Sequence, residues 1–97
     1  MEGREYVVGS RVAVWGRFRV AGVLTDPTTV RCYVKQPGVP AVVHEFPVAD
    51  MTKEEIGAYR FEFTLSEEGP WGVRWEGTGA LEAVDELLIQ CVPSAVV

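Results

Sequence analysis

Few side chains in this sequence have the type and spacing that catalysis requires. The only histidine is His44, and no Gly-x-Ser-x-Gly elbow or Cys–His spacing typical of a nucleophile accompanies it. Two carboxylate pairs, Glu54-Glu55 and Glu67-Glu68, are each formed by adjacent residues. Adjacent residues of an extended chain point to opposite sides, so neither pair is expected to share a proton. We therefore predict that the chain is not an enzyme, that both pairs are solvated loop charges, and that His44 is a half-exposed strand residue.

Patterns for metals, phosphates and cofactors are equally weak. Cys32 and Cys91 have no companion Cys or His at zinc-ligand spacing, and no loop of alternating Asp or Asn residues suits calcium. The Gly77-Thr78-Gly79 segment lacks the Lys and the helix start of a phosphate-binding loop, so a turn explains it better. We expect no metal and no cofactor.

Strands must position these residues, because much of the sequence alternates between apolar and polar with a period of two. The clearest segments are residues 11–20, 30–35, 59–65 and 71–75, separated by turn signals such as the Asp26-Pro27 pair. The positions predicted to face inward are Val12, Val14, Phe18, Val20, Val30, Cys32, Val34, Tyr59, Phe61, Phe63, Leu65, Trp71, Val73 and Trp75.

The other segments are less regular. Residues 6–8 predict a short strand, residues 41–48 an edge strand bracketed by prolines, and residues 50–55 a connector with one helical turn. Residues 80–91 are ambiguous, since they combine helical spacing with strong helix formers. We favour a strand over residues 86–92, with Leu87, Ile89 and Cys91 inward, because the sheet needs one more partner; a short helical turn over residues 80–84 is compatible with it.

About seven strands with turns between them predict one all-β domain, an immunoglobulin-like antiparallel β-sandwich over residues 6–93. Residues 1–5 and 94–97 would be flexible or docked on a partner. The strands that carry Cys32 and Cys91 would flank a middle strand, about 9–10 Å apart. A disulfide needs a Cα separation below about 7 Å, so we expect two free thiols.

Charge and hydropathy exclude further classes of protein. The net charge is −5, which disfavours nucleic acid as a partner. Residues 1–35 hold six basic and three acidic side chains, and residues 36–97 hold three and eleven, so the molecule is expected to be electrically polar. No apolar run is long enough to span a membrane, and no secretory signal begins the sequence, so we expect no membrane partner and synthesis in the cytosol.

The exposed face of residues 11–20 is the strongest candidate for a binding surface. Alternation places Trp15 outward among Arg11, Arg17 and Arg19, and Trp with Arg is the composition of an interface hot spot. A Trp lying flat on its own sheet, in cation–π contact with an Arg, fits the pattern equally well. The corresponding patch on the other sheet would consist of Arg31, Tyr33 and Lys35.

An ordered set of short motifs resembles a known family. Val8-Gly9 precedes the first long strand, Pro27-Thr-Thr-Val30 opens the third, and Gly57-Ala-Tyr59 opens the fifth. A Trp-x-x-Arg-Trp motif followed by Gly-Thr-Gly fills residues 71–79. Together they resemble the small immunoglobulin-like proteins encoded among the virion structural genes of tailed bacteriophages. Leu87-Leu88 departs from that family, in which a Gly-Ser pair opens the last strand.

The resemblance implies an accessory or decorating protein on a phage head, neck or tail, made in the cytoplasm of the bacterial host. Its partners would be a capsid or other virion protein, with copies of itself as a further option, and the family supplies no catalytic residue. The alternative reading is a carbohydrate- or receptor-binding adhesion module, in which Trp15 or Tyr33 stacks on sugar rings.

Overall fold

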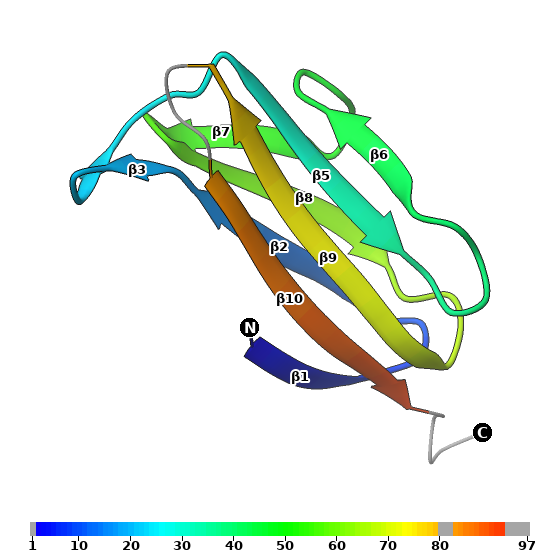
Figure 1. Ribbon diagram of the computed structural model, residues 1–97. Coiled ribbons are helices and arrows are strands. Elements are labelled where there is room, and N and C mark those ends of the chain that lie inside the picture. The colour runs from blue at the N-terminus through cyan, green and yellow to red at the C-terminus, as the bar shows by residue number, and fades with distance from the viewer. Residues whose placement is uncertain (1, 80–82, 93–97) are drawn as a thin grey trace.

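Two layers of β-sheet make up the residues described by the computed structural model, 2–79 and 83–92, and no helix occurs among them (Figure 1). The five-stranded sheet has the order β1 (Glu2–Val7), β10 (Ala83–Val92), β9 (Gly69–Thr78), β5 (Thr29–Lys35) and β6 (Val42–Glu45). The three-stranded sheet has the order β2 (Arg11–Arg17), β8 (Ala58–Thr64) and β7 (Met51–Glu55). A hairpin of β3 (Arg19–Val20) and β4 (Val23–Leu24) projects from one end. The prediction of an all-β chain is confirmed.

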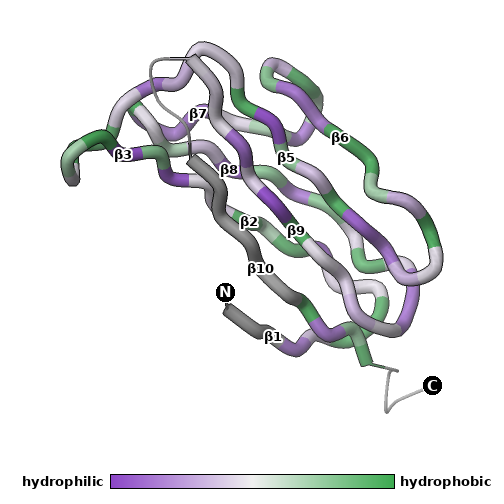
Figure 2. The backbone as a smooth tube through the Cα atoms, in the orientation of Figure 1, coloured by the Kyte–Doolittle hydropathy of each residue, from purple (hydrophilic) through white to green (hydrophobic). Residues whose placement is uncertain are grey.

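Hydropathy alternates along the strands (Figure 2), and the apolar side chains build the interior, as predicted. Every second residue of β2, β5 and β9 is buried, and those of β5 and β9 face those of β2 and β8 across the gap between the sheets. Phe63 is only half-buried, whereas Ile89 and Cys91 of β10 are fully buried. The predicted core is therefore confirmed for most positions.

Val20 is the clearest exception, because it is 47% exposed rather than inward-facing. The chain leaves the sheet after Phe18, and β3 pairs with β4 in the projecting hairpin instead of continuing β2. The face that alternation assigns to Val20 therefore has no opposing sheet to cover it.

Three predicted turns or connectors are wrong in part. Residues 51–55 form β7 rather than a helical turn, because their backbone pairs with β8. Ala83 and Val84 belong to β10, and Gly77 and Thr78 belong to β9, because these two strands pair without a break from Ala83 opposite Gly77 to Cys91 opposite Gly69. Ladder pairing overrides the helix propensity of this segment.

The first strand is longer than predicted. It begins at Glu2 rather than Tyr6, and it pairs in parallel with β10 from Leu87 to Val92. The structure does not describe residues 80–82, the side chain of Leu87 or residues 93–97. The predictions made for them therefore lie outside the described residues.

Asp26 joins the hairpin end of the fold to β7 and β8. One carboxylate oxygen accepts hydrogen bonds from the backbone N–H of Gly57 at 2.8 Å and from the Tyr59 hydroxyl at 3.3 Å. The other accepts one from Lys53 at 2.7 Å. These bonds, with that from Lys53 contributing most, lower the pKa of Asp26. The sequence predicted a turn at Asp26. It did not predict these hydrogen bonds, because their donors lie 27 or more positions away along the chain.

The two cysteines are free thiols, as expected. Cys32 lies on β5 and Cys91 on β10, so β9 separates them. Burial raises the pKa of Cys32 to about 12, which removes its reactivity as a thiolate. No helix in the described part of the chain is long and apolar enough to cross a membrane.

Candidate functional site

The outer face of the three-stranded sheet carries the predicted aromatic site. Arg11, Ala13, Trp15 and Arg17 point outward from β2, and Trp15 is 39% exposed. The Arg17 guanidinium lies 4.9 Å from the centroid of the Trp15 ring, a cation–π contact. The structure is therefore compatible with both interpretations of Trp15, as an interface residue and as a ring held on its own sheet. Arg17 packs on the ring, and over a third of the residue's surface is still exposed to solvent.

Carboxylates make this face less basic than the sequence suggested. Arg60, opposite Trp15 on β8, pairs with Glu54 at 2.8 Å and with Glu62 at 3.5 Å. Arg11 pairs with Asp50 at 3.0 Å. The surface is therefore an aromatic centre within a mixed-charge surround, which is the composition of an interface core with a polar rim.

Glu54 also corrects an expectation. It was predicted as a solvated loop charge, but it lies in β7 and holds Arg60. Glu67 and Glu68, by contrast, are exposed in the connector between β8 and β9, as predicted.

The second predicted patch lies on the other side of the molecule. Arg31, Tyr33 and Lys35 point outward from β5 in the five-stranded sheet, where partners occupy each polar head. Arg31 pairs with Glu45 at 2.7 Å, the Tyr33 hydroxyl donates to Glu76 at 3.5 Å, and Lys35 donates to the Val39 carbonyl at 3.0 Å. The structure thus does not gather the seven predicted residues into one site. It joins Trp15 to Arg17, leaves Arg11 at the far end of β2, places Arg19 on the hairpin, and puts the other three on the opposite face.

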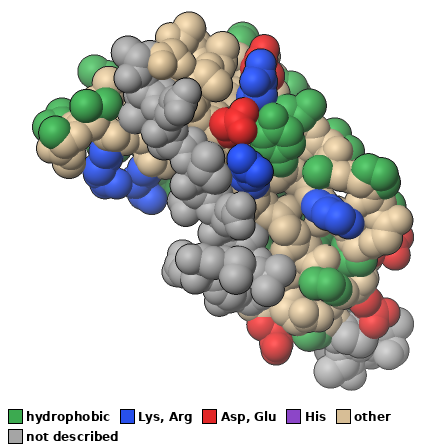
Figure 3. Space-filling model, in the orientation of Figure 1, with side chains coloured by type: hydrophobic (Ala, Val, Ile, Leu, Met, Phe, Trp, Pro, Cys, Tyr) green, Lys and Arg blue, Asp and Glu red, His purple; other side chains and the backbone are tan. Residues whose placement is uncertain are grey.

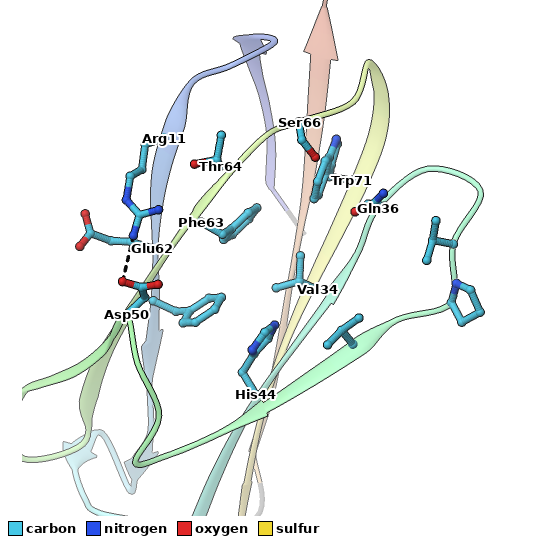
Figure 4. Close-up of a pocket in the computed structure, with 14 residues that line it drawn as sticks. Arg11, Val34, Gln36, His44, Asp50, Glu62, Phe63, Thr64, Ser66 and Trp71 are labelled. Carbon is cyan, nitrogen blue, oxygen red and sulfur yellow. Dashed lines mark ion pairs between the residues drawn. The ribbon is translucent and has the colours of Figure 1, made fainter.

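A pocket that the sequence did not reveal opens between the sheets at the end remote from the hairpin. Its cavity volume is about 370 Å³, and its apolar walls include Val34, Phe61, Phe63 and Trp71 (Figure 4). A continuous aromatic run forms one side. His44 lies 4.5 Å from Phe61, and Phe63 stacks at 5.9 Å on both Phe61 and Trp71, all measured between ring centroids.

Polar groups surround the rim of this pocket. The Arg11–Asp50 ion pair closes one side, and Gln36 and Ser66 lie at the other (Figure 4). His44 is half-buried, as predicted, and burial lowers the pKa of its imidazole, which favours the neutral ring. The signal that could have indicated the pocket is the Pro37-Gly38-Val39-Pro40 connector, which turns away from β5 before β6 returns to it.

No group of three or more His, Cys, Asp or Glu side chains placed to hold a metal occurs in the described residues. No family model matches the chain, and no curated protein is significantly similar to it. The candidate sites therefore rest on geometry alone, and two remain: the Trp15 face and the pocket beside β6.

Proposed function

We propose that this chain is a non-enzymatic, immunoglobulin-like accessory protein of a tailed-phage virion, and that it decorates the head, neck or tail through protein–protein contacts. It would be made in the cytoplasm of the bacterial host and act by burying surface on the particle. A stable contact of this kind buries about 800 Å² per partner, and a repeated lattice multiplies weaker contacts.

The strand arrangement supports the immunoglobulin-like assignment. A β2-β8-β7 sheet faces a β10-β9-β5-β6 sheet, and the first strand pairs in parallel with the last. The motifs that carry the phage resemblance also fall at structurally distinct positions. Pro27 precedes β5, Gly57 adopts a positive φ of 74° before β8, and Trp71 and Trp75 are core residues of β9.

The exposed Trp15 is the observation that carries the binding role. A tryptophan held on a flat sheet face by Arg17 has little conformational freedom left to lose when a partner covers it. Its ring supplies a large apolar area, and the surrounding ion pairs of Arg11 and Arg60 form a polar rim. Residues of this type and setting dominate the energy of protein interfaces.

The direct test is co-sedimentation of the purified chain with tailed-phage particles of its own source that lack it. We expect Trp15→Ala to weaken binding by about 30-fold, the effect of losing a hot spot of about 2 kcal/mol. The same substitution should lower the free energy of unfolding by less than about 1 kcal/mol, because it removes only a surface contact.

Tyr33→Ala is the matched control, since it removes an aromatic ring from the opposite face. The site assignment fails if Tyr33→Ala weakens binding and Trp15→Ala does not. The virion role fails if the wild-type chain does not sediment with particles, and binding to a glycan array would then favour the adhesion alternative.

A further inference from the structure

The β3–β4 hairpin carries an apolar tip that nothing in the described fold covers. Val20 and Val23 are 47% and 65% exposed, and Ile56 in the adjoining β7–β8 turn is 62% exposed. Figure 2 colours the hairpin as hydrophobic, and Figure 3 shows hydrophobic side chains gathered at that end above basic ones. We call Val20, Val23 and Ile56 the tip.

The tip is rigid rather than a loose loop. Ala21 and Gly22 both have positive φ, 49° and 82°, as a two-residue type I′ turn requires. At the base, the Phe18 N–H donates to the Gly57 carbonyl at 2.8 Å, and the Thr25 N–H donates to the Phe18 carbonyl at 2.9 Å. These bonds hold the hairpin against the β7–β8 turn, so docking the tip would cost little ordering entropy.

The pocket lies at the other end of the molecule. Pairing of β2 with β8 places Arg17 opposite Ala58 near the tip, and Arg11 opposite Thr64 near the pocket. Val39 and Val42, 40% and 53% exposed, line the pocket as well. A protruding apolar surface and a recessed one therefore lie beyond opposite ends of β2.

The balance of charged side chains also differs between the tip and the pocket. Arg17 and Arg19, both exposed, lie beside the tip. Asp50 and Glu62 line the pocket but are paired with Arg11 and Arg60, and the Lys35 ammonium lies on the carbonyl of Val39 in the pocket wall. Glu67 and Glu68, both exposed, follow Ser66 at the rim and make its balance negative. The sequence predicted an electrically polar molecule. In the fold, Arg17 and Arg19 outnumber the exposed Glu55 beside the tip, whereas the rim of the recess has an excess of carboxylates.

We propose that the tip of one copy of this chain inserts into the pocket of a second copy. The branched side chains of Val20 and Val23 would contact Phe63, Trp71 and Val42, while Arg17 and Arg19 approach the acidic rim. Because the two surfaces differ, the contact is heterologous, and repetition gives a chain or a closed ring rather than a two-fold dimer. This self-association does not depend on the proposed virion role, since neither the tip nor the pocket wall includes Trp15 or Arg60, although Arg17 and Arg11 border both surfaces.

Complementary variants test the contact. Val23→Asp places a charge on the tip and leaves the pocket intact, and Val42→Arg blocks the pocket mouth and leaves the tip intact. Sedimentation velocity over a concentration series should show concentration-dependent association of the wild type. Each variant alone should associate at least tenfold more weakly, because an apolar side chain is lost from the contact or excluded from it.

Mixing the two variants is the decisive step. The intact tip of the Val42→Arg chain can enter the intact pocket of the Val23→Asp chain, so the mixture should form a one-to-one dimer that grows no further. Val43→Asp and Val43→Arg are matched controls, since Val43 is 50% exposed on β6 but does not line the pocket. Both should associate as the wild type does, and a thermal melt should show every variant folded.

Three results would overturn the proposal. The wild type could remain monomeric up to about millimolar concentration, the mM range at which even weak contacts form. Val42→Arg alone could associate normally, which would indicate a tip-to-tip contact. The mixture of variants could remain monomeric although the wild type associates, which would place the contact elsewhere.

Discussion

Two aromatic clusters share one core but differ in how they are packed. The closed cluster, near the hairpin, consists of Phe18, Phe46, Tyr59 and Trp75, whose rings meet edge to face at 5.2–6.5 Å between centroids. The open cluster consists of His44, Phe61, Phe63 and Trp71, tilted or stacked at 4.5–5.9 Å beside the cavity. The alternation of β8 supplies rings to both, Tyr59 to the closed cluster and Phe61 and Phe63 to the open one.

Glycine explains much of the difference. A Cβ at Gly77 would lie 2.9 Å from Phe18, and one at Gly16 would lie 2.6 Å from Cε3 of Trp75. The backbones of β9 and β2 therefore contact the rings of the closed cluster directly. At the same end, Asp26 accepts hydrogen bonds from Gly57, Tyr59 and Lys53, a set of contacts that we call the Asp26 clasp. In the open cluster, the Trp71 indole N–H donates to the Glu67 carbonyl at 2.9 Å, and a cavity lies beside the rings. The closed end of the sandwich is thus packed more tightly, and the open end has room for a ligand or partner.

The largest expected effect is loss of a ring from the closed cluster. Phe18→Ala should lower the free energy of unfolding by about 3–5 kcal/mol, because the side chain is fully buried and its neighbours cannot collapse into the gap. Phe63→Ala, in the open cluster, should cost about 1–2 kcal/mol, because that ring is half-buried beside existing space. Urea denaturation measures both, and equal losses would remove the contrast between the clusters.

Overpacking the closed cluster should have the next largest effect. Gly16→Ala inserts a methyl group against the Trp75 ring and should cost about 1–3 kcal/mol. Gly72→Ala is the matched control on β9, since the nearest atom to its Cβ would be 4.0 Å away and no strain is expected. The account of Gly16 would be wrong if both variants unfolded at the same urea concentration.

A smaller effect should come from the Asp26 clasp, and it should depend on pH. Asp26→Asn removes the attraction to Lys53 and should cost up to about 1 kcal/mol at pH 7. The folded pKa of Asp26 is lowered from 3.8, so the wild-type advantage is present above that pH and is lost as the pH falls through the folded value. Denaturation midpoints at pH 7, 5, 3 and 2 should show the gap between wild type and variant closing only below about pH 4; a gap constant down to pH 2 would contradict this role.

The smallest effect should come from His44 in the open cluster. Burial lowers its pKa from 6.5, so the unfolded chain takes up a proton first and stability declines as the pH falls below 6.5. Titration of the His44 ring by NMR should give a midpoint below 6.5 in the folded chain and near 6.5 in urea. A midpoint above 6.5 in the folded chain would mean that a nearby carboxylate such as Asp50, rather than burial, governs the ring.

Local periodicity made the core predictable from sequence, whereas the sites depend on contacts that periodicity does not encode. Alternation identified Trp15 as outward and Trp71 and Trp75 as buried, because each depends only on the side of a strand. Alternation failed at Val20, where the chain leaves the sheet. The helical turn predicted for the connector at residues 50–55 was wrong because residues 51–55 pair with β8. The pocket and the Asp26 clasp could not be predicted, because each joins residues from several strands and connectors.

Hydroxyl-radical footprinting of the chain, free and bound to phage particles, tests the proposed binding role most directly. Trp15 and Tyr33 lie on opposite faces, and both rings react readily with radicals when solvent reaches them. The account predicts that particle binding slows oxidation of Trp15 several-fold and leaves Tyr33 unchanged. Unchanged oxidation of Trp15 on bound chain, with or without protection of Tyr33, would contradict it.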